Sequence, residues 1–245
     1  MKKVFSILLV AFAMSAIVAS CEKENVGNGN HTDSVPNDTT GTGGIPGGVV
    51  TSPQWVDLGL PSGLLWATCN VGATAPEKYG DYFAWGETQT KSVYNCSTYR
   101  YCNGYMNYLT KYCTDTNSGY YGFIDNLTTL VPADDAATVL GNGARTPTKA
   151  EWEELINKTT ATWTTVNGVA GCKLTSNNGK SIFLPAAGSA GVGGAGDYGF
   201  YWSSSLNTDL PCFAWIFYFV SDGQEMSNKT FRYYGLSVRA VKNAN

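Results

Sequence analysis

The chain of 245 residues ends on an extended, mostly apolar segment, YYGLSVRAV, at positions 233–241. Tyrosine and branched aliphatic residues favour β-strands, so this segment predicts a strand. A strand at the end of a domain buries its apolar side chains by completing a structure that earlier segments have formed. We therefore expect a fold that is closed by its last strand.

The segments upstream predict an α+β domain over residues 54–245. From Trp55 onward, short extended stretches alternate with glycine turns, as in QWVDLGLPSGLLWATCNVG. Further strands are expected around residues 172–174, 181–188, 200–205 and 212–220. In the last of these, alternation places Trp215, Phe217 and Phe219 on a core side and Ile216 and Tyr218 on the other. Residues 91–125 show no period and are interpreted as a long ordered loop.

Two helices are predicted. The first lies in TPTKAEWEELINK, where Thr148 and Glu151 have the spacing of a capping box and the apolar residues after them share one face. The second is a short helix in PADDAATVLG. Asp134 and Asp135 suit the positive end of its dipole, and Gly141 suits its end.

The N-terminus predicts export and lipid anchoring. Residues 1–20 have a positive start, an apolar run too short for a membrane span, and small residues before Cys21, which resembles the lipobox of a bacterial lipoprotein. An ordinary secretory signal is the alternative. Residues 21–53 are rich in Gly, Asn, Thr and Pro and predict a flexible tether. Ser34 and Thr39 lie in short stretches that resemble an O-glycosylation motif of Bacteroidetes.

The charge content excludes a nucleic-acid partner. Charged residues make up 14% of the chain and the formal net charge is −3, whereas about 25% charged residues is usual. There is no basic run of the kind that binds phosphates. The polar surface must therefore act through hydrogen bonds and stacking rather than through electrostatic steering.

Six segments in one order carry a family resemblance: WVDLGLPSGLLWATCNVGA, YGDYFAWGET, DDAATVLGNGARTPTKAEWEEL, GVAGCKLTSNNGKSIFLPAAG, YWSSS and YYGLSVRAV. Together, over residues 55–242, they resemble the Fibrobacter succinogenes major paralogous domain of Bacteroidetes surface lipoproteins. The stretch GNGARTP departs from it, because such domains usually carry a WRMPT-like sequence there.

The resemblance implies a C-type-lectin-like fold with mixed short strands, two helices and long Gly/Asn/Tyr-rich loops. In such folds the first and last strands pair, so YYGLSVRAV is expected to pair near residues 64–69. Gly235 would permit a tight backbone entry. Arg239 would be a buried, paired arginine, with ligand contact as the alternative.

The residue inventory predicts no enzyme, no cofactor and no metal site. The one histidine, His31, lies in the tether, so the domain lacks histidine triads and histidine zinc sites. The six domain cysteines have no CxxC spacing, so we expect disulfides or buried thiols rather than a copper or thiol site. Calcium-lectin strings such as EPN, QPD and WND are absent. Asp81, Glu87, Asp197, Asp209 and Asp222 are the carboxylates from which an acidic pair could be built.

The remaining interpretation is ligand binding at the surface of an outer-membrane lipoprotein, in adhesion or recognition of an extracellular glycan or protein. In C-type-lectin-like folds the C-terminal half carries the ligand face. The candidate ligand-binding residues are Tyr218, Tyr233, Tyr234, Arg232, Asn207, Asp209 and Asn228. A structural, fimbria-associated subunit and a carbohydrate-active enzyme are the alternatives.

The lipobox resemblance gives a first prediction. Replacing Cys21 with Ala should abolish labelling by a fatty-acid probe and release the protein from the membrane fraction, because the acceptor thiol is lost. Labelling that persists in the Cys21→Ala variant would contradict the anchor.

Overall fold

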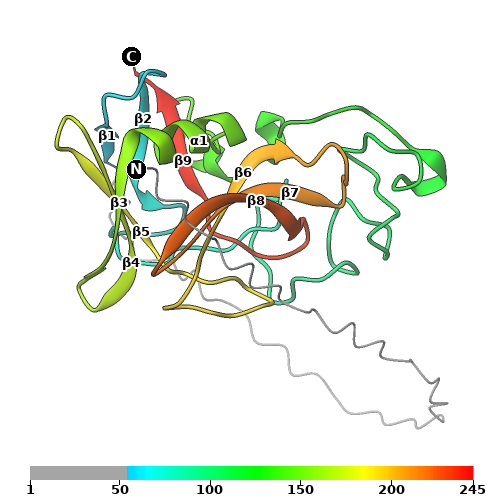
Figure 1. Cartoon of the computed structure of the whole chain (residues 1–245). Coiled ribbons are helices and arrows are strands. Elements are labelled where there is room, and N and C mark those ends of the chain that lie inside the picture. The colour runs from blue at the N-terminus through cyan, green and yellow to red at the C-terminus, as the bar shows by residue number, and fades with distance from the viewer. Residues whose placement is uncertain (1–53, 245) are drawn as a thin grey trace, which may run out of the picture. The chain divides into compact units, whose positions relative to one another are not determined.

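The computed structural model describes residues 54–244, which form three three-stranded antiparallel sheets and one α-helix (Figure 1). The sheets are ordered β1-β2-β9, β3-β4-β5 and β6-β7-β8. The predicted signal peptide, the tether, Cys21, Ser34 and Thr39 lie outside the described residues. Within the described part, no helix is long and apolar enough to cross a membrane. The strands are β1 Trp55–Asp57, β2 Leu64–Asn70, β3 Thr159–Val166, β4 Val169–Ser176, β5 Ser181–Pro185, β6 Gly199–Leu206, β7 Phe213–Val220, β8 Gly223–Phe231 and β9 Arg239–Asn243.

The closing strand is confirmed. β9 pairs antiparallel with β2, with Leu64 opposite Asn243 and Trp66 opposite Val241. The ladder begins later than the sequence indicated, because residues 233–238 form single bridges to three other segments before β9 starts. At Gly235 a Cβ would come within 2.7 Å of the Tyr94 ring and 2.9 Å of the Ala190 side chain. Glycine is therefore needed for close approach, as expected.

Arg239 is fully buried at the start of β9. Its guanidinium donates to the carbonyls of Ala67 and Thr68 at 2.9 and 2.6 Å, and to that of Phe183 on β5 at 2.9 Å. Two further bonds reach Asn70 Oδ1 at 3.0 and 2.7 Å. The buried arginine is thus paired with neutral oxygens from two sheets, and the structural interpretation of this residue is confirmed.

The first predicted helix is α1, Lys149–Lys158. Thr148 accepts from the Glu151 amide and the Glu151 carboxylate accepts from the Thr148 amide, which completes the capping box. Trp152 and Leu155 are buried, so the apolar face packs as the spacing predicted.

The second predicted α-helix is wrong. Residues 132–140 form two short 3₁₀ helices, Pro132–Asp134 and Ala136–Leu140, separated by Asp135 in an extended conformation. The Asp135 carboxylate caps the Ala137 amide, and it also accepts from the amide and the hydroxyl of Thr146. These tertiary bonds hold Asp135 out of a helical conformation, so the turns cannot merge.

β7 is covered on both faces, which explains why simple alternation along it failed. Phe217 and Phe219 pack with Trp152 in one core cluster, whereas Ile216 is equally buried in a second cluster around Trp85. Trp215 is only half-buried, and its ring centroid lies 4.4 Å from Lys149 Nζ. The β7–β8 register also shifts between Ala214 and Ile216. A strand covered on both faces cannot be divided into a core side and a solvent side.

The buried guanidinium gives a second prediction. Arg239→Ala should lower the free energy of unfolding by about 3 kcal/mol or more, because it leaves buried carbonyl oxygens without donors. Urea denaturation would measure this loss. Arg100→Ala, at an exposed arginine, is the control and should change stability by only about 0.5 kcal/mol. Equal effects of the two substitutions would contradict the role of Arg239 in closure.

Candidate functional site

The predicted ligand residue Tyr218 lies in a stack of three rings on neighbouring strands. Phe200 on β6 is directly opposite Tyr218 on β7, with ring centroids 5.2 Å apart. Tyr198 stacks on both rings, at 6.0 and 6.3 Å. Tyr218 is half-buried, and this burial raises the pKa of its hydroxyl. Most of its ring surface therefore serves packing within the domain.

Tyr233 and Tyr234 lie in a second aromatic group. Phe231 stacks on Phe213 at 4.3 Å and on Tyr233 at 5.1 Å, and Tyr233 contacts Tyr234 edge to face at 4.8 Å. Both tyrosines are half-buried and pack against the cluster around Trp85. Tyr233 and Tyr234 lie where the chain leaves β8 and enters the closing segment. Part of each ring is therefore already covered by neighbouring side chains.

Arg232 needs a correction, because it is buried rather than part of a ligand face. Its side chain is 1% exposed. The guanidinium donates to the carbonyls of Lys111, Tyr112 and Pro211 and to the Tyr99 hydroxyl, all at 2.9 to 3.0 Å. Every direction in which it can donate faces the protein, so it supports the structure instead of contacting a ligand.

Of the three remaining candidates, Asn207 and Asp209 lie in the turn after β6 and Asn228 lies on β8. Asn207 is buried, and its side-chain oxygen accepts from the amides of Asp209 and Leu210. Its side-chain nitrogen donates to the Asn228 carbonyl on β8. Asp209 is exposed and Asn228 half-buried. Asn207 therefore shapes the turn, and only Asp209 of this group presents an unobstructed side chain.

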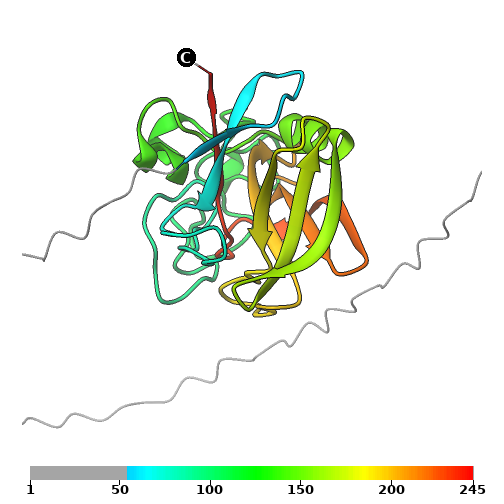
Figure 2. The same cartoon turned by 90° about the vertical axis from the view of Figure 1, so that its left-hand side faces the viewer.

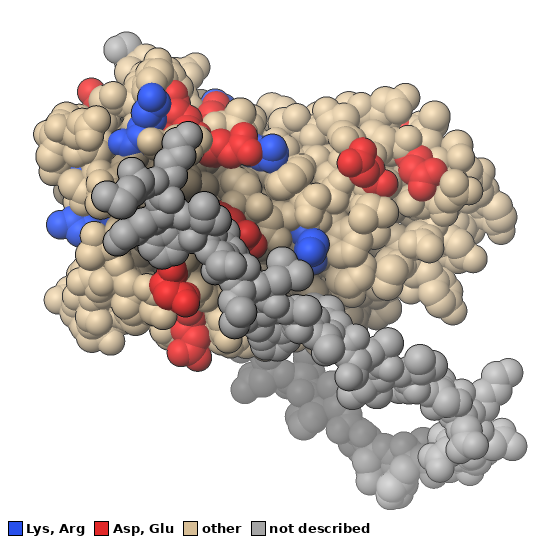
Figure 3. Space-filling model, viewed as in Figure 1, with Lys and Arg blue, Asp and Glu red and all other residues tan. Residues whose placement is uncertain are grey.

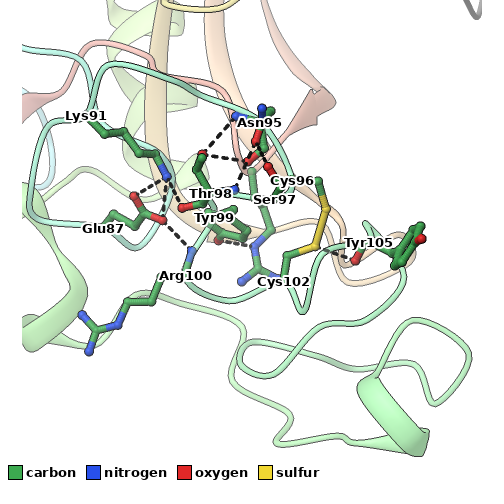
Figure 4. Close-up of a disulfide and its surroundings, with 11 residues drawn as sticks. Glu87, Lys91, Asn95, Cys96, Ser97, Thr98, Tyr99, Arg100, Cys102 and Tyr105 are labelled. Carbon is green, nitrogen blue, oxygen red and sulfur yellow. Dashed lines mark hydrogen bonds and ion pairs between the residues drawn. A yellow bond between two sulfur atoms is a disulfide. The ribbon is translucent and has the colours of Figure 1, made fainter. Parts of the chain in front are cut away.

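Arg232 instead anchors the tyrosine-rich loop, residues 91–125, through the Lys111 and Tyr112 carbonyls. A disulfide between Cys96 and Cys102 closes the first part of this loop (Figure 4). Beside it, Glu87 pairs with Lys91 at 2.7 Å and accepts from the Arg100 amide at 2.7 Å. The loop is therefore ordered by specific bonds, in agreement with its interpretation as an ordered loop.

Two aspartates fix the second half of the loop. Asp125 accepts from the amides of Tyr112, Cys113 and Leu127 at 2.9 to 3.1 Å. Asp134 accepts from Lys111 Nζ and from the Tyr112 hydroxyl, both at 2.5 Å. Burial acts to raise the pKa of Asp134, but these hydrogen bonds outweigh it and hold the pKa below its ordinary value. The carboxylate is therefore charged at neutral pH and fastens the loop.

On this support the loop exposes four connected tyrosine rings, Tyr105, Tyr108, Tyr120 and Tyr121, which we call the tyrosine surface. Tyr105, Tyr108 and Tyr121 are 69%, 44% and 91% exposed, and Tyr120 is half-buried. Successive ring centroids are 5.3, 5.7 and 4.3 Å apart, with interplanar angles of 70°, 62° and 56°. The rings form a continuous but non-planar array.

Backbone bonds hold the two halves of the tyrosine surface together. The Tyr120 amide donates to the Leu109 carbonyl at 2.8 Å, and the Leu109 amide donates to the Ser118 carbonyl at 2.9 Å. Leu109 itself is buried. The rings thus project from a fixed base.

The surroundings of the tyrosine surface are apolar or neutral. Met106, Phe123 and Ile124 are exposed in the same two turns. Residues 101–131 contain only three charged residues, Lys111, Asp115 and Asp125. Lys111 pairs with Asp134, and the aspartates bond to loop backbone. In Figure 3 the right-hand part of the molecule, which holds this loop region in Figure 1, shows two separate acidic groups on an otherwise uncharged face.

A cavity of about 450 Å³ lies elsewhere, beside the segment GNGARTP. Thr129, Thr138, Asn142, Arg145 and Ser204 contribute to its wall. Arg145 forms a two-pronged ion pair with Glu151, at 2.7 and 2.6 Å. Asp135 is the carboxylate in the lining, and its oxygens accept from Ala137 and Thr146. The cavity therefore offers one engaged carboxylate, where a glycosidase needs two free to act.

The cysteines offer no reactive centre in the described part of the chain. Cys69, Cys113, Cys172 and Cys212 are unpaired there. Burial raises the pKa of Cys172 to about 11 and also raises the pKa of Cys113 and Cys212. The thiols of Cys113, Cys172 and Cys212 therefore stay protonated at neutral pH and are weak nucleophiles. Among residues 54–244, no three His, Cys, Asp or Glu side chains are grouped to hold a metal ion.

No family model, curated protein or solved structure matches this chain. The candidate site therefore depends on geometry alone. Sequence reasoning did not place it in the tyrosine-rich loop. The available signal was composition, because residues 101–122 hold six tyrosines among Asn, Gly, Ser and Thr without any period.

The anchoring of the loop gives a third prediction. Arg232→Met keeps an apolar stem but removes the donors to three carbonyls, so the loop should open locally. Limited proteolysis with mass spectrometry should show faster cleavage within residues 103–124, while the sheets remain protected. Lys229→Met, at an exposed position, is the matched control. An unchanged cleavage pattern in Arg232→Met would contradict the anchoring role.

Proposed function

We propose that this protein is a non-enzymatic, lipid-anchored surface protein whose domain binds an extracellular ligand through the tyrosine surface. The observation that carries the proposal is the exposure of Tyr105, Tyr108 and Tyr121 on a loop fixed by a disulfide, a buried arginine and two aspartates. A fixed aromatic surface loses little conformational freedom when it binds a ligand.

The chemistry of the loop supports recognition. Antibody paratopes are rich in Tyr, Ser, Gly and Asn, because tyrosine supplies large contact area at low entropic cost and the small polar residues supply hydrogen bonds. Residues 101–122 have this composition. Exposed apolar groups such as Met106 and Ile124 add to the same surface, and contiguous exposed apolar patches mark binding sites.

The geometry of the rings favours a protein ligand over a glycan. A sugar chain stacks best on rings that lie flat beside one another, whereas successive rings here are inclined by 56° to 70°. Inclined rings leave notches that side chains of a protein can fill. A glycan ligand remains the alternative that the binding experiment distinguishes.

The fold and location belong to the same proposal. We assign the domain to the Fibrobacter succinogenes major paralogous domain family, with a C-type-lectin-like fold on the bacterial outer membrane. The ordered motifs in the sequence support this assignment. The antiparallel pairing of β2 with β9 and the long ordered loop are consistent with it.

The two alternatives receive less support from the described residues. A carbohydrate-active enzyme would need a pair of free carboxylates in a cleft, and the cavity beside GNGARTP offers only Asp135, which is engaged. A fimbria-associated subunit would need surfaces that join copies into a polymer. Co-purification of the protein with a filament would favour that second alternative.

The fourth prediction tests the tyrosine surface directly. The chain from residue 21 onward, carrying Cys21→Ala, would be screened against arrays of extracellular proteins and of glycans. Tyr105→Ala and Tyr121→Ala should each weaken binding to the ligand found by about 1–3 kcal/mol. Their melting temperatures should stay close to that of the parent, since both rings are exposed.

Binding should also survive a chelator and depend weakly on salt, because neither ions nor free charges contribute. Val139→Ser replaces an exposed apolar side chain outside the loop and is the control. A ligand whose affinity is unchanged in both tyrosine variants, or is abolished by chelator, would contradict the proposed surface. If Tyr218→Ala lost binding while Tyr105→Ala and Tyr121→Ala kept it, the binding site would lie on β7 instead.

A further inference from the structure

Among the residues that the structure describes, nothing pairs with the outer edge of β3. β3 pairs with β4 over eight residues, from Thr159 opposite Ser176 to Val166 opposite Val169, and it is the last strand on its side of the sheet (Figure 2). Within residues 54–244, no backbone hydrogen bond reaches β3 from the other side. Residues 160–162 and Thr165 are exposed.

The turn after β3 determines which backbone groups face outward. Asn167 and Gly168 form the two-residue connection, with φ of 48° and 83°, so Val166 and Val169 form a directly hydrogen-bonded pair. Hydrogen-bonded and non-bonded positions alternate along an antiparallel ladder. The N–H and C=O groups of Ala161, Trp163 and Thr165 therefore point away from β4.

The free edges of β6, β8 and β9 are covered or charged. The edge of β6 is covered by two single bridges, from Thr129 to Ser205 and from Ser237 to Tyr201. The edge of β9 is covered by a bridge from Arg145 to Val241. The free edge of β8 carries Glu225 and Lys229. Charged side chains and covering segments are the usual means of preventing strand pairing.

β3 has neither protection. Its sequence, TTATWTTV, contains no charge and no proline. The nearest charge across the sheet is Lys173, opposite Thr162 on β4 and one strand removed from the edge.

We propose that β3 pairs antiparallel with β3 of a second copy about a twofold axis, joining two three-stranded sheets into one of six strands. The outward groups of Ala161, Trp163 and Thr165 would then meet the same groups of the other copy. This interface is independent of the tyrosine surface.

The chemistry of the strand favours a second copy as the occupant. Two identical strands bring like side chains together, which is unfavourable for charged residues but favourable for threonines, since Thr–Thr pairs stabilise antiparallel sheets. A charged peptide would find no opposite charge on β3. Because a twofold interface uses the same edge on both copies, it closes at a dimer and leaves β3 with no free edge for a polymer.

The test uses the chain from residue 21 onward with Cys21→Ala. Sedimentation equilibrium should show a monomer at low concentration and a dimer that increases with concentration. Hydrogen exchange in the peptide covering residues 159–166 should slow over the same range, because the outward amides become bonded. A monomer at all concentrations, with exchange independent of concentration, would overturn the proposal.

Two edge variants localise the interface. Ala161→Pro removes one outward N–H and leaves the bonds to β4 in place, so the dimer should weaken at least tenfold. Thr162→Lys should weaken it similarly by placing lysines close together, with partial recovery at high salt. Thr162→Lys keeps the test valid if the proline variant does not fold.

Glu225→Lys, on the edge of β8, is the matched control and should leave the dimer unchanged. A dimer that survives both β3 variants would place the interface elsewhere and overturn the proposal. Protection of residues 159–166 that requires an added second protein would overturn it as well, because the edge would then bind a different chain.

Discussion

The closure of the domain depends on one buried cation, the guanidinium of Arg239. It bonds to oxygens of β2 and to the Phe183 carbonyl of β5, so it connects the closing sheet with the β3–β4–β5 sheet. Burial lowers the pKa of this arginine, which expresses the cost of removing a charge from water. Five hydrogen bonds to neutral oxygens offset that cost, and they require all of the contributing segments to be in place. Arg239 on β9, near the end of the domain, therefore completes the packing of β2, near its start.

Arg232 repeats this arrangement for the tyrosine-rich loop. Its guanidinium lies 4.9 Å from the Trp85 ring and bonds to carbonyls from residues 111–112 and 211. A long loop without regular structure leaves many carbonyl groups unpaired, and an arginine with five donors can satisfy several of them at once. The same residue that stabilises the loop is therefore unable to contact a ligand. The structural role of Arg232 is therefore separate from the recognition role proposed for the exposed tyrosines.

Predictions from the sequence were right for features that depend on local pattern. They failed where contacts with distant segments determine the conformation or the burial of a residue. The capping box of Thr148 and Glu151 and the order of the tyrosine-rich loop followed from local pattern, whereas the pairing of the closing strand and the burial of Arg239 were expected from the family resemblance. The helix at residues 132–140 failed because Thr146 holds Asp135 extended. Arg232 was placed at the surface because nothing in its neighbourhood reveals the carbonyls of residues 111–112. The exposure of Tyr121 could not be separated from the burial of Tyr112 by sequence, since both lie in aperiodic sequence of similar composition.

The separation between support and surface has a consequence for how this domain can change. Tyr112, Asp125 and Asp134 stabilise the loop through hydrogen bonds. The rings of Tyr105 and Tyr121, by contrast, are mostly exposed to solvent. Under the proposed function, replacing an exposed ring would alter what the surface binds while the free energy of unfolding changes little. The half-buried rings of Tyr218 and Tyr233 do not have this freedom, because each also packs against a neighbouring strand or the closing segment. The exposed rings of the tyrosine surface can thus vary without disturbing the closure that Arg239 provides.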